Sequence, residues 1–141
     1  MTEEVKAYID TGRKFRQSLR KNGYILIVED DRAISRICMH MVKAHHHKVK
    51  WVSTVHEAKQ TIIEDSNNIQ CVLVDLTLPD GDGEEVVELI ETEYKKLPYI
   101  VYTADREKGR MLSAKYYRAC VVLKGESLDN LVDALGLEDH A

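Results

Sequence analysis

The 141-residue chain lacks any long hydrophobic run and contains little cysteine. No apolar stretch approaches the ~20 residues needed to cross a bilayer, and no signal-like segment opens the sequence, which argues against a membrane-inserted protein. The three cysteines (Cys38, Cys71 and Cys120) are an odd set, and all lie within apolar segments. They are typical of small buried side chains in a reducing compartment rather than of a disulfide framework, so we expect a cytoplasmic protein.

Net positive charge is also scarce, except at the N-terminus. Residues 1–23 have a balance of +3, whereas the whole chain has a net charge of −4, which leaves −7 for the rest. An acidic body argues against direct nucleic-acid binding and is compatible with a site for a metal cation. A length of 141 residues with 44% hydrophobic content suits one globular domain with a core of its own.

From residue 24 onward, short apolar runs alternate with segments of helical periodicity. The predicted strands are Tyr24–Val28, Lys48–Ser53, Cys71–Val74, Pro98–Tyr102 and Ala119–Leu123. The second alternates Lys with Val and Trp, as an edge strand does. The third is a continuous apolar run with β-branched residues, typical of a strand buried on both faces. The pattern predicts an α/β fold of five βα units, with a parallel sheet and helices on both faces.

The helical segments carry apolar residues at helical spacing, but one of them is weak. Glu107–Lys115 has a thin apolar stripe, and Gly109 interrupts it. Residues 1–23 lie outside the alternation and are predicted to be a basic extension or linker before a domain spanning 24–138. Whether the extension is an amphipathic helix, the end of a linker or a solvated tail stays open.

Four of the predicted strands run into residues with reactive side chains. These residues are Glu29, Asp30, Asp31, Asp75, Thr103 and Lys124. Because the carboxyl ends of parallel strands share one edge of a sheet, we expect these side chains to meet in one crevice. Each alone has an ordinary explanation as a turn, a surface residue or, for Asp31, a helix cap. As a set, they would require several independent accidents at the same edge.

These motifs closely resemble the receiver domain of bacterial two-component response regulators, over roughly residues 24–136. The resemblance is carried by the segments Ile27–Asp31, Val72–Gly83, Tyr102–Ala104 and Val122–Lys124. Each segment alone is a weak match, but all four in order are highly specific. The resemblance implies a flavodoxin-like, doubly wound five-stranded sheet in three layers; its strand order, 2-1-3-4-5, is taken from the family and not from the pattern.

The resemblance also implies a role for each residue at the crevice. Asp75 would accept a phosphoryl group from a histidine kinase or histidine phosphotransfer protein, forming a mixed anhydride. The implied Mg²⁺ ligands are Asp30, Asp75, the backbone carbonyl of Thr77 and, through a bound water, Glu29. Lys124 and Thr103 would stabilise the phosphoryl oxygens, because catalysis of this transfer is mostly positioning and charge stabilisation. We therefore expect a phosphorelay module that switches protein–protein contacts, without separate substrate turnover.

Two positions depart from the family. Members commonly carry an aromatic residue three positions before the lysine and a proline after it, and this chain has Val121 and Gly125 there. A cis bond before a non-proline residue costs about 2.5–4 kcal/mol, so we expect a trans bond after Lys124 and a differently shaped loop. These departures leave open a phosphate-independent pseudo-receiver scaffold. A phosphatase with an aspartate nucleophile is disfavoured, because Thr77 stands where such enzymes need a second acid.

Two other features have ordinary explanations. The run His45-His46-His47 is interpreted as a solvated helix end rather than a metal site. Trp51, on the predicted edge strand, is interpreted as a packing residue.

Overall fold

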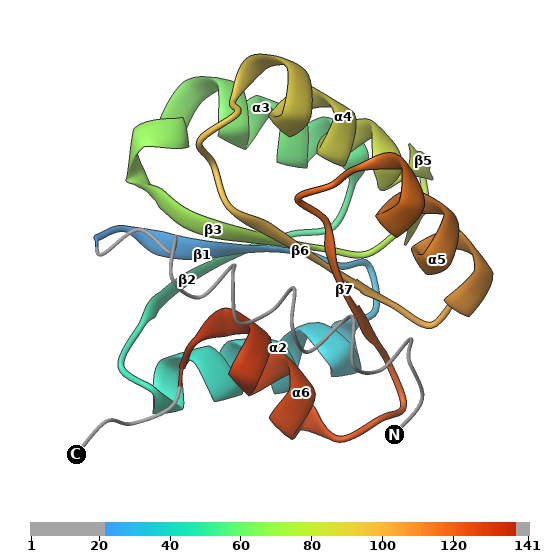
Figure 1. Cartoon of the computed structure of the whole chain (residues 1–141). Coiled ribbons are helices and arrows are strands. Elements are labelled where there is room, and N and C mark those ends of the chain that lie inside the picture. The colour runs from blue at the N-terminus through green and yellow to red at the C-terminus, as the bar shows by residue number, and fades with distance from the viewer. Residues whose placement is uncertain (1–21, 138–141) are drawn as a thin grey trace.

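The computed structural model describes residues 22–137, in which one parallel sheet lies between two helical layers (Figure 1). The sheet has five strands in the order β2-β1-β3-β6-β7. Their bounds are Tyr24–Val28 for β1, Lys48–Val52 for β2, Ile69–Val74 for β3, Tyr99–Thr103 for β6 and Cys120–Leu123 for β7. Every pairing between them is parallel. Numbered along the chain, this order is 2-1-3-4-5, so the predicted flavodoxin-like fold is confirmed.

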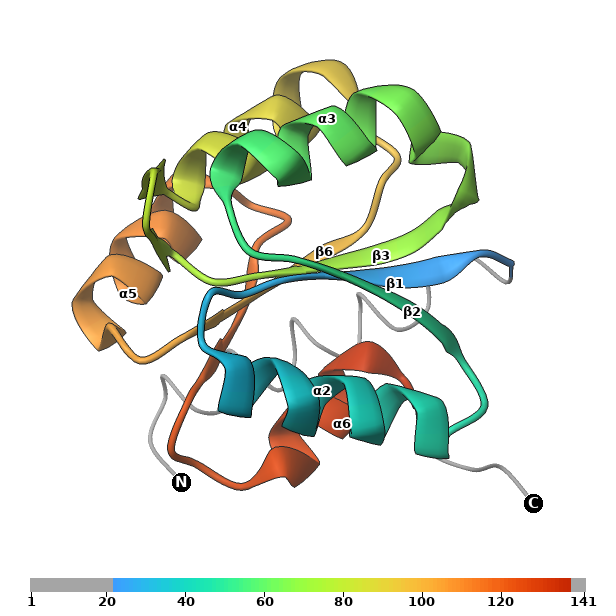
Figure 2. The ribbon, with the colours of Figure 1, turned by 180° about the vertical axis from the view of Figure 1, so that it is seen from behind.

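The helices divide between the two faces of the sheet (Figures 1 and 2). One face is covered by α2 (Arg32–Ala44) and α6 (Leu128–Leu135), and the other by α3 (Val55–Asp65), α4 (Glu84–Glu93) and α5 (Arg106–Lys115). A 3-10 turn, η1 (Ser66–Asn68), leads into β3, and the loop after β3 contains a small antiparallel pair, β4 (Thr77–Leu78) with β5 (Gly81–Asp82). No helix within residues 22–137 is long and apolar enough to cross a membrane.

Alternate residues of the strands supply two separate cores. In β1, Ile25 and Ile27 face α2 and α6, whereas Leu26 and Val28 face α3 and α4. The predicted run Cys71–Val74 is buried as expected, and β3 begins two residues earlier, at Ile69, with all six of its residues buried. Because successive side chains of a strand point to opposite faces, a one-residue shift in register would exchange the two cores.

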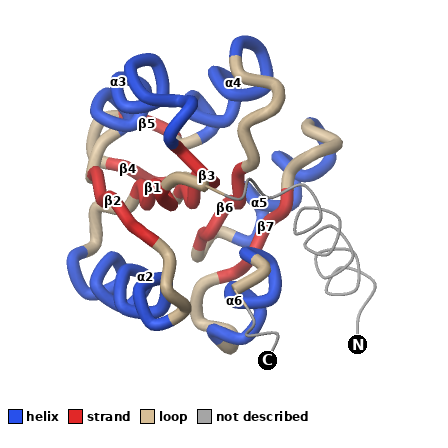
Figure 3. The backbone as a smooth tube through the Cα atoms, turned by 90° about the vertical axis from the view of Figure 1, so that its left-hand side faces the viewer, coloured by secondary structure: helices blue, strands red, loops and turns tan. Residues whose placement is uncertain are grey.

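The crevice lies where the chain changes direction within the sheet. From β1 the chain crosses to the edge strand β2 through α2, and from β3 it crosses the other way to β6 through α4. These two helices lie on opposite faces, so the loops after β1 and β3 diverge (Figure 3). Ligands of doubly wound sheets bind at such a point, outside the carboxyl ends of the strands.

Helix α5 is regular, and Gly109 does not interrupt it. The residue is buried, and a Cβ atom there would lie 2.8 Å from Val121 Cγ1 and 3.4 Å from Thr103 Cγ2. Glycine is therefore present for close packing of α5 on β6 and β7, which a local helix propensity does not reveal.

Two further predictions concern the end of α2 and the N-terminal extension. The segment after α2 is a helix end as predicted, and His46 there has a φ of 66°. The predicted basic extension falls on residues 1–23, of which only the last two lie within the described part of the chain.

Candidate functional site

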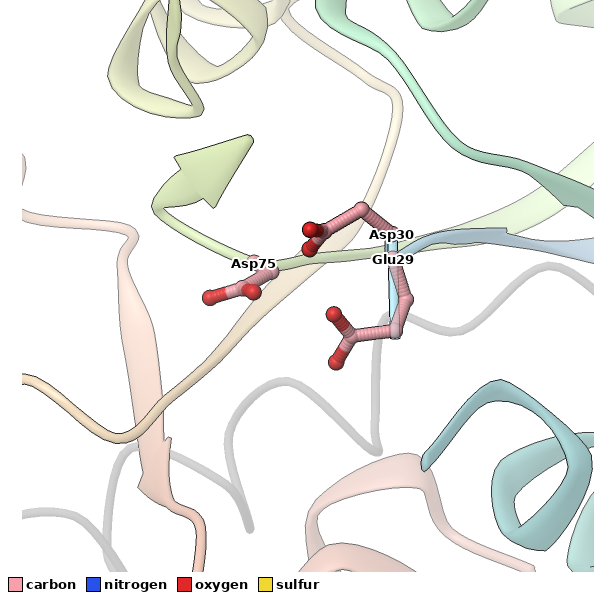
Figure 4. A group of neighbouring side chains, drawn as sticks. All are labelled: Glu29, Asp30 and Asp75. Carbon is pink, nitrogen blue, oxygen red and sulfur yellow. The ribbon is translucent and has the colours of Figure 1, made fainter. Parts of the chain in front are cut away.

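Three carboxylates meet at the carboxyl ends of β1 and β3. One oxygen from each of Glu29, Asp30 and Asp75 lies within 4.8 Å of the others (Figure 4). Because Val28 pairs with Val74 in the parallel register, the residues that follow the two strands lie side by side. Glu29 and Asp75 are only 3% and 7% exposed, whereas Asp30 is exposed. The cluster is therefore closed on its inner side and opens to solvent at Asp30.

The ammonium of Lys124 lies between the two buried carboxylates. Its Nζ is 2.5 Å from Glu29 Oε1 and 3.0 Å from Asp75 Oδ2, and the side chain is 12% exposed. Burial raises the pKa of Glu29 to about 7. The hydrogen bond to Lys124 lowers this pKa, and the neighbouring Asp75 carboxylate raises it further. For Lys124, burial favours the neutral form, but its hydrogen bonds to Glu29 and Asp75 outweigh burial and raise its pKa. The site thus holds a lysine that stays charged beside the predicted nucleophile.

The end of β6 places Thr103 beside Lys124. The lysine backbone N–H donates to the carbonyl of Thr103 at 2.8 Å, so the two residues are adjacent at the sheet edge. Thr103 is buried, and its Oγ1 accepts a hydrogen bond from the Asp105 N–H at 3.1 Å. A hydroxyl that accepts from an amide still has its own hydrogen to donate. Its methyl group faces Gly109 of α5.

The loop after β3 is held by contacts that the sequence interpretation did not include. Asp80 accepts hydrogen bonds from the Val55 and His56 backbone N–H groups at 2.7 and 3.0 Å, at the start of α3. These bonds stabilise the carboxylate and lower the pKa of Asp80. Gly83 lies so close to the Asp75 carbonyl that a Cβ atom would overlap it. The sequence Pro79-Asp80-Gly81 indicates a turn at this point. It does not indicate that Asp80 bonds to Val55, which lies 25 residues away in the chain.

The loop after β1 is held at both ends. Asp31 caps α2, accepting from the Ala33 and Ile34 N–H groups at 2.9 and 3.1 Å, which confirms its interpretation as a helix cap. The Glu29 N–H donates to the Val52 carbonyl of β2 at 3.1 Å. The acids therefore sit on a short segment anchored to the sheet on one side and to a helix on the other.

Comparison with known proteins identifies the family. The model of the response regulator receiver domain matches residues 25–136. The chain belongs to the response regulator receiver domain family. Its similarity to the transcriptional regulatory protein SrrA of Staphylococcus aureus is 34% identity over 84 residues, which cover 60% of this chain and 34% of SrrA. The chain thus matches about a third of the length of these curated relatives.

Solved receiver domains share the fold. The non-phosphorylated HemR receiver domain from Leptospira biflexa is 27% identical, with a TM-score of 0.67 over 81% of this chain and 91% of HemR's. A response regulator receiver domain protein from Clostridium thermocellum has a TM-score of 0.71 at 19% identity, over 80% of this chain and 90% of that one. At that identity the second comparison supports the fold alone.

Both departures from the receiver pattern have structural consequences. Val121 is fully buried beneath Gly109, so this position holds a fixed aliphatic side chain and no ring. Gly125 has a φ of 87°, in the left-handed region that favours glycine and that proline cannot adopt. Residues 22–137 contain no cis peptide bond, so the trans bond predicted after Lys124 is confirmed.

The acidic cluster suits a hard divalent cation. It consists of carboxylate oxygens, and Mg²⁺ prefers oxygen ligands and keeps several of its waters. Within residues 22–137, the Asp30 carboxylate has no polar partner, so it is available as a ligand on the open side of the cluster. The predicted site residues Glu29, Asp30 and Asp75 thus lie together, and Lys124 contacts Glu29 and Asp75. Thr103 and Thr77 flank them, and the Thr77 N–H lies 3.3 Å from Asp75 Oδ1.

Proposed function

We propose that this receiver domain accepts a phosphoryl group on Asp75 in a Mg²⁺-dependent reaction. The donor would be the phosphohistidine of a histidine kinase or a histidine phosphotransfer protein. The observation that carries the proposal is the position of Lys124, whose ammonium lies between the buried carboxylates of Glu29 and Asp75. One site then combines a nucleophile, a fixed positive charge and an open acidic face.

In the proposed transfer, one Asp75 carboxylate oxygen forms a bond to phosphorus as the phosphorus–nitrogen bond of the donor breaks. The imidazole nitrogen leaves with that electron pair and takes up a proton. Lys124, whose Nζ lies 3.0 Å from Asp75 Oδ2, and the Thr103 hydroxyl would stabilise the phosphoryl oxygens. Asp30, Asp75, the backbone carbonyl of Thr77 and, through a bound water, Glu29 would hold Mg²⁺, which would supply further positive charge. Ala104 is small and exposed, and it would leave the approach to Asp75 open.

The consequence of transfer is a change of protein contacts. A phosphoryl group adds roughly −1.5 to −2 charges at the sheet edge, which would bias the loops after β3 and β6 between two arrangements. The output would be binding to a protein partner, without direct contact to nucleic acid. We place the protein in the cytoplasm, where its three free, buried cysteines would stay reduced. In this proposal, residues 24–138 form the receiver and 1–23 a basic extension or linker.

Intact-mass spectrometry after incubation with acetyl phosphate and Mg²⁺ tests the proposal. We expect one hydroxylamine-labile phosphoryl adduct on the wild-type protein and none on Asp75→Asn or in the presence of EDTA. Asp82→Asn is the matched control, since it removes the same charge from the same loop, and it should still be labelled. A folded, Mg²⁺-binding protein that gains no adduct from acetyl phosphate or from phosphohistidine donors would instead be a phosphate-independent scaffold. The Val121 and Gly125 departures are the features that favour that alternative.

A further inference from the structure

The indole of Trp51 makes a polar contact with the loop that carries the acids. Its Nε1–H donates to the backbone carbonyl of Glu29 at 2.6 Å. Trp51 lies opposite Ile27 in the β1–β2 register, and its half-buried ring packs on the α2–α6 side of the sheet. The edge strand therefore reaches across the end of β1 to the first acid of the cluster.

The bonded carbonyl belongs to the peptide unit that joins Glu29 to Asp30. A peptide unit is planar, so fixing its oxygen also fixes the N–H of Asp30 and limits the directions in which both side chains leave the backbone. The Glu29 side chain is already held by Lys124, and its N–H by Val52. The Asp30 carboxylate, in contrast, has no polar partner within residues 22–137. Among the described contacts, the indole bond is therefore the one that orients the Asp30 peptide.

We propose that Trp51 is a positioning residue for Mg²⁺ binding, acting through the Glu29 carbonyl on Asp30. The inference rests on the proposed function, because it assigns Asp30 to the metal. Groups that orient metal ligands typically contribute about 10- to 100-fold to metal affinity. Alternatively, Trp51 has a packing role alone, and its hydrogen bond only satisfies the half-buried indole N–H, which can act as a donor but not as an acceptor. In that case Mg²⁺ binding would require the ring but not its N–H. The two roles are separated by removing the N–H and keeping the ring.

The test compares Mg²⁺ affinity, measured by calorimetry, for three variants and the wild-type protein. Trp51→Phe removes the donor with part of the ring. Incorporating benzothienylalanine at position 51 replaces the N–H with sulfur and keeps the bicyclic shape. Val49→Ala is the matched control, because Val49 packs on the same core from the same strand. We expect both Trp51 replacements to weaken Mg²⁺ binding about tenfold and Val49→Ala to leave it unchanged.

A second readout uses the fact that Trp51 is the chain's single tryptophan. The wild-type ¹H–¹⁵N spectrum should contain one indole resonance that shifts with added Mg²⁺, and half of the total shift should be reached at the calorimetric midpoint. Wild-type affinity in the benzothienylalanine protein would overturn the positioning role while leaving the proposed function intact. A folded wild-type protein that binds no Mg²⁺ would overturn both.

Discussion

The two halves of the functional edge are built in different ways. Around β1 and β3, the acids and their loops are fixed by hydrogen bonds and an ion pair, as with Glu29 and Lys124. Around β6 and β7, close contact between small or aliphatic groups dominates, with Gly109 against Val121. The first half keeps the residue types of the receiver pattern, whereas the second keeps Thr103 and Lys124 but departs from the pattern at Val121 and Gly125. In the proposed function, the chemistry and its transmission to the rest of the fold would therefore rest on separate structural features.

The packed half suggests how a change at the site would spread. No ring stands at Val121 to rotate, and the Thr103 methyl lies against Gly109. A displacement of Thr103 toward a phosphoryl group would thus be felt by α5 through direct contact. Three substitutions test this contrast between the polar half and the packed half, and a fourth, His46→Gly, is a reference outside both.

The largest effect is expected from Lys124→Met. It leaves the Glu29 and Asp75 carboxylates, with side chains 4% and 8% exposed, facing each other without a cation. We expect loss of the phosphoryl adduct and a decrease of about 3 kcal/mol in the free energy of unfolding without metal, at the low end for a broken buried pair because Glu29 can take up a proton. Urea unfolding in EDTA measures this, and added Mg²⁺ should restore part of the loss.

The control for that variant is Lys108→Met. Lys108 forms an exposed ion pair with Asp82 at 3.5 Å, and such pairs contribute at most about 1 kcal/mol. If Lys124→Met and Lys108→Met lower the free energy of unfolding by the same amount, the buried ion pair does not stabilise the polar half.

Gly109→Ala probes the packed half. Alanine is favoured over glycine in a helix by about 1 kcal/mol, but its Cβ would lie 2.8 Å from Val121 Cγ1. We expect overpacking to prevail and to destabilise the protein by about 1–3 kcal/mol, with Mg²⁺ affinity unchanged. Adding Val121→Ala removes the obstructing methyl, so a double-mutant cycle should show favourable coupling. A stabilising Gly109→Ala would mean that α5 is not held closely on β7.

A smaller effect is expected far from both halves, at the end of α2. His46 has a φ of 66°, which costs roughly 1–2 kcal/mol for a residue with a side chain. His46→Gly should therefore stabilise the protein by about 1 kcal/mol in thermal unfolding, without changing phosphorylation. His45→Gly is the control: with a φ of −95° it gains nothing from glycine and should be destabilised.

The smallest effect concerns acid stability and Asp80. Hydrogen bonds from His56 and Val55 lower the folded-state pKa of this carboxylate below its ordinary value of 3.8. Its contribution to stability is therefore present above about pH 4 and is lost as the pH falls through the folded-state pKa. Asp80→Asn should lower the melting temperature at neutral pH, and the difference from wild type should shrink in acid. A difference that stays constant with pH, or one matched by Asp82→Asn, would contradict the assignment.

The features that could be predicted from the sequence are those with a local cause. The β-branched run at Cys71–Val74 identifies a buried strand, and the residue after each run, such as Asp75 or Lys124, must lie at the shared edge. Contacts between distant segments could not be predicted this way. Trp51 meets Glu29 across 22 residues, and Gly109 looks like a helix breaker until Val121 is seen beneath it. Helix and strand propensities describe a segment in isolation, whereas the roles of Trp51 and Gly109 depend on the residues that they contact in the folded protein.

Mapping the phosphoryl group to a residue tests the central claim most directly. Borohydride reduces an aspartyl phosphate to homoserine, which peptide sequencing by mass spectrometry can locate after treatment with acetyl phosphate and Mg²⁺. The account predicts homoserine at position 75, dependent on Mg²⁺ and lost in Lys124→Met. Homoserine at another aspartate, with position 75 unmodified, would contradict it.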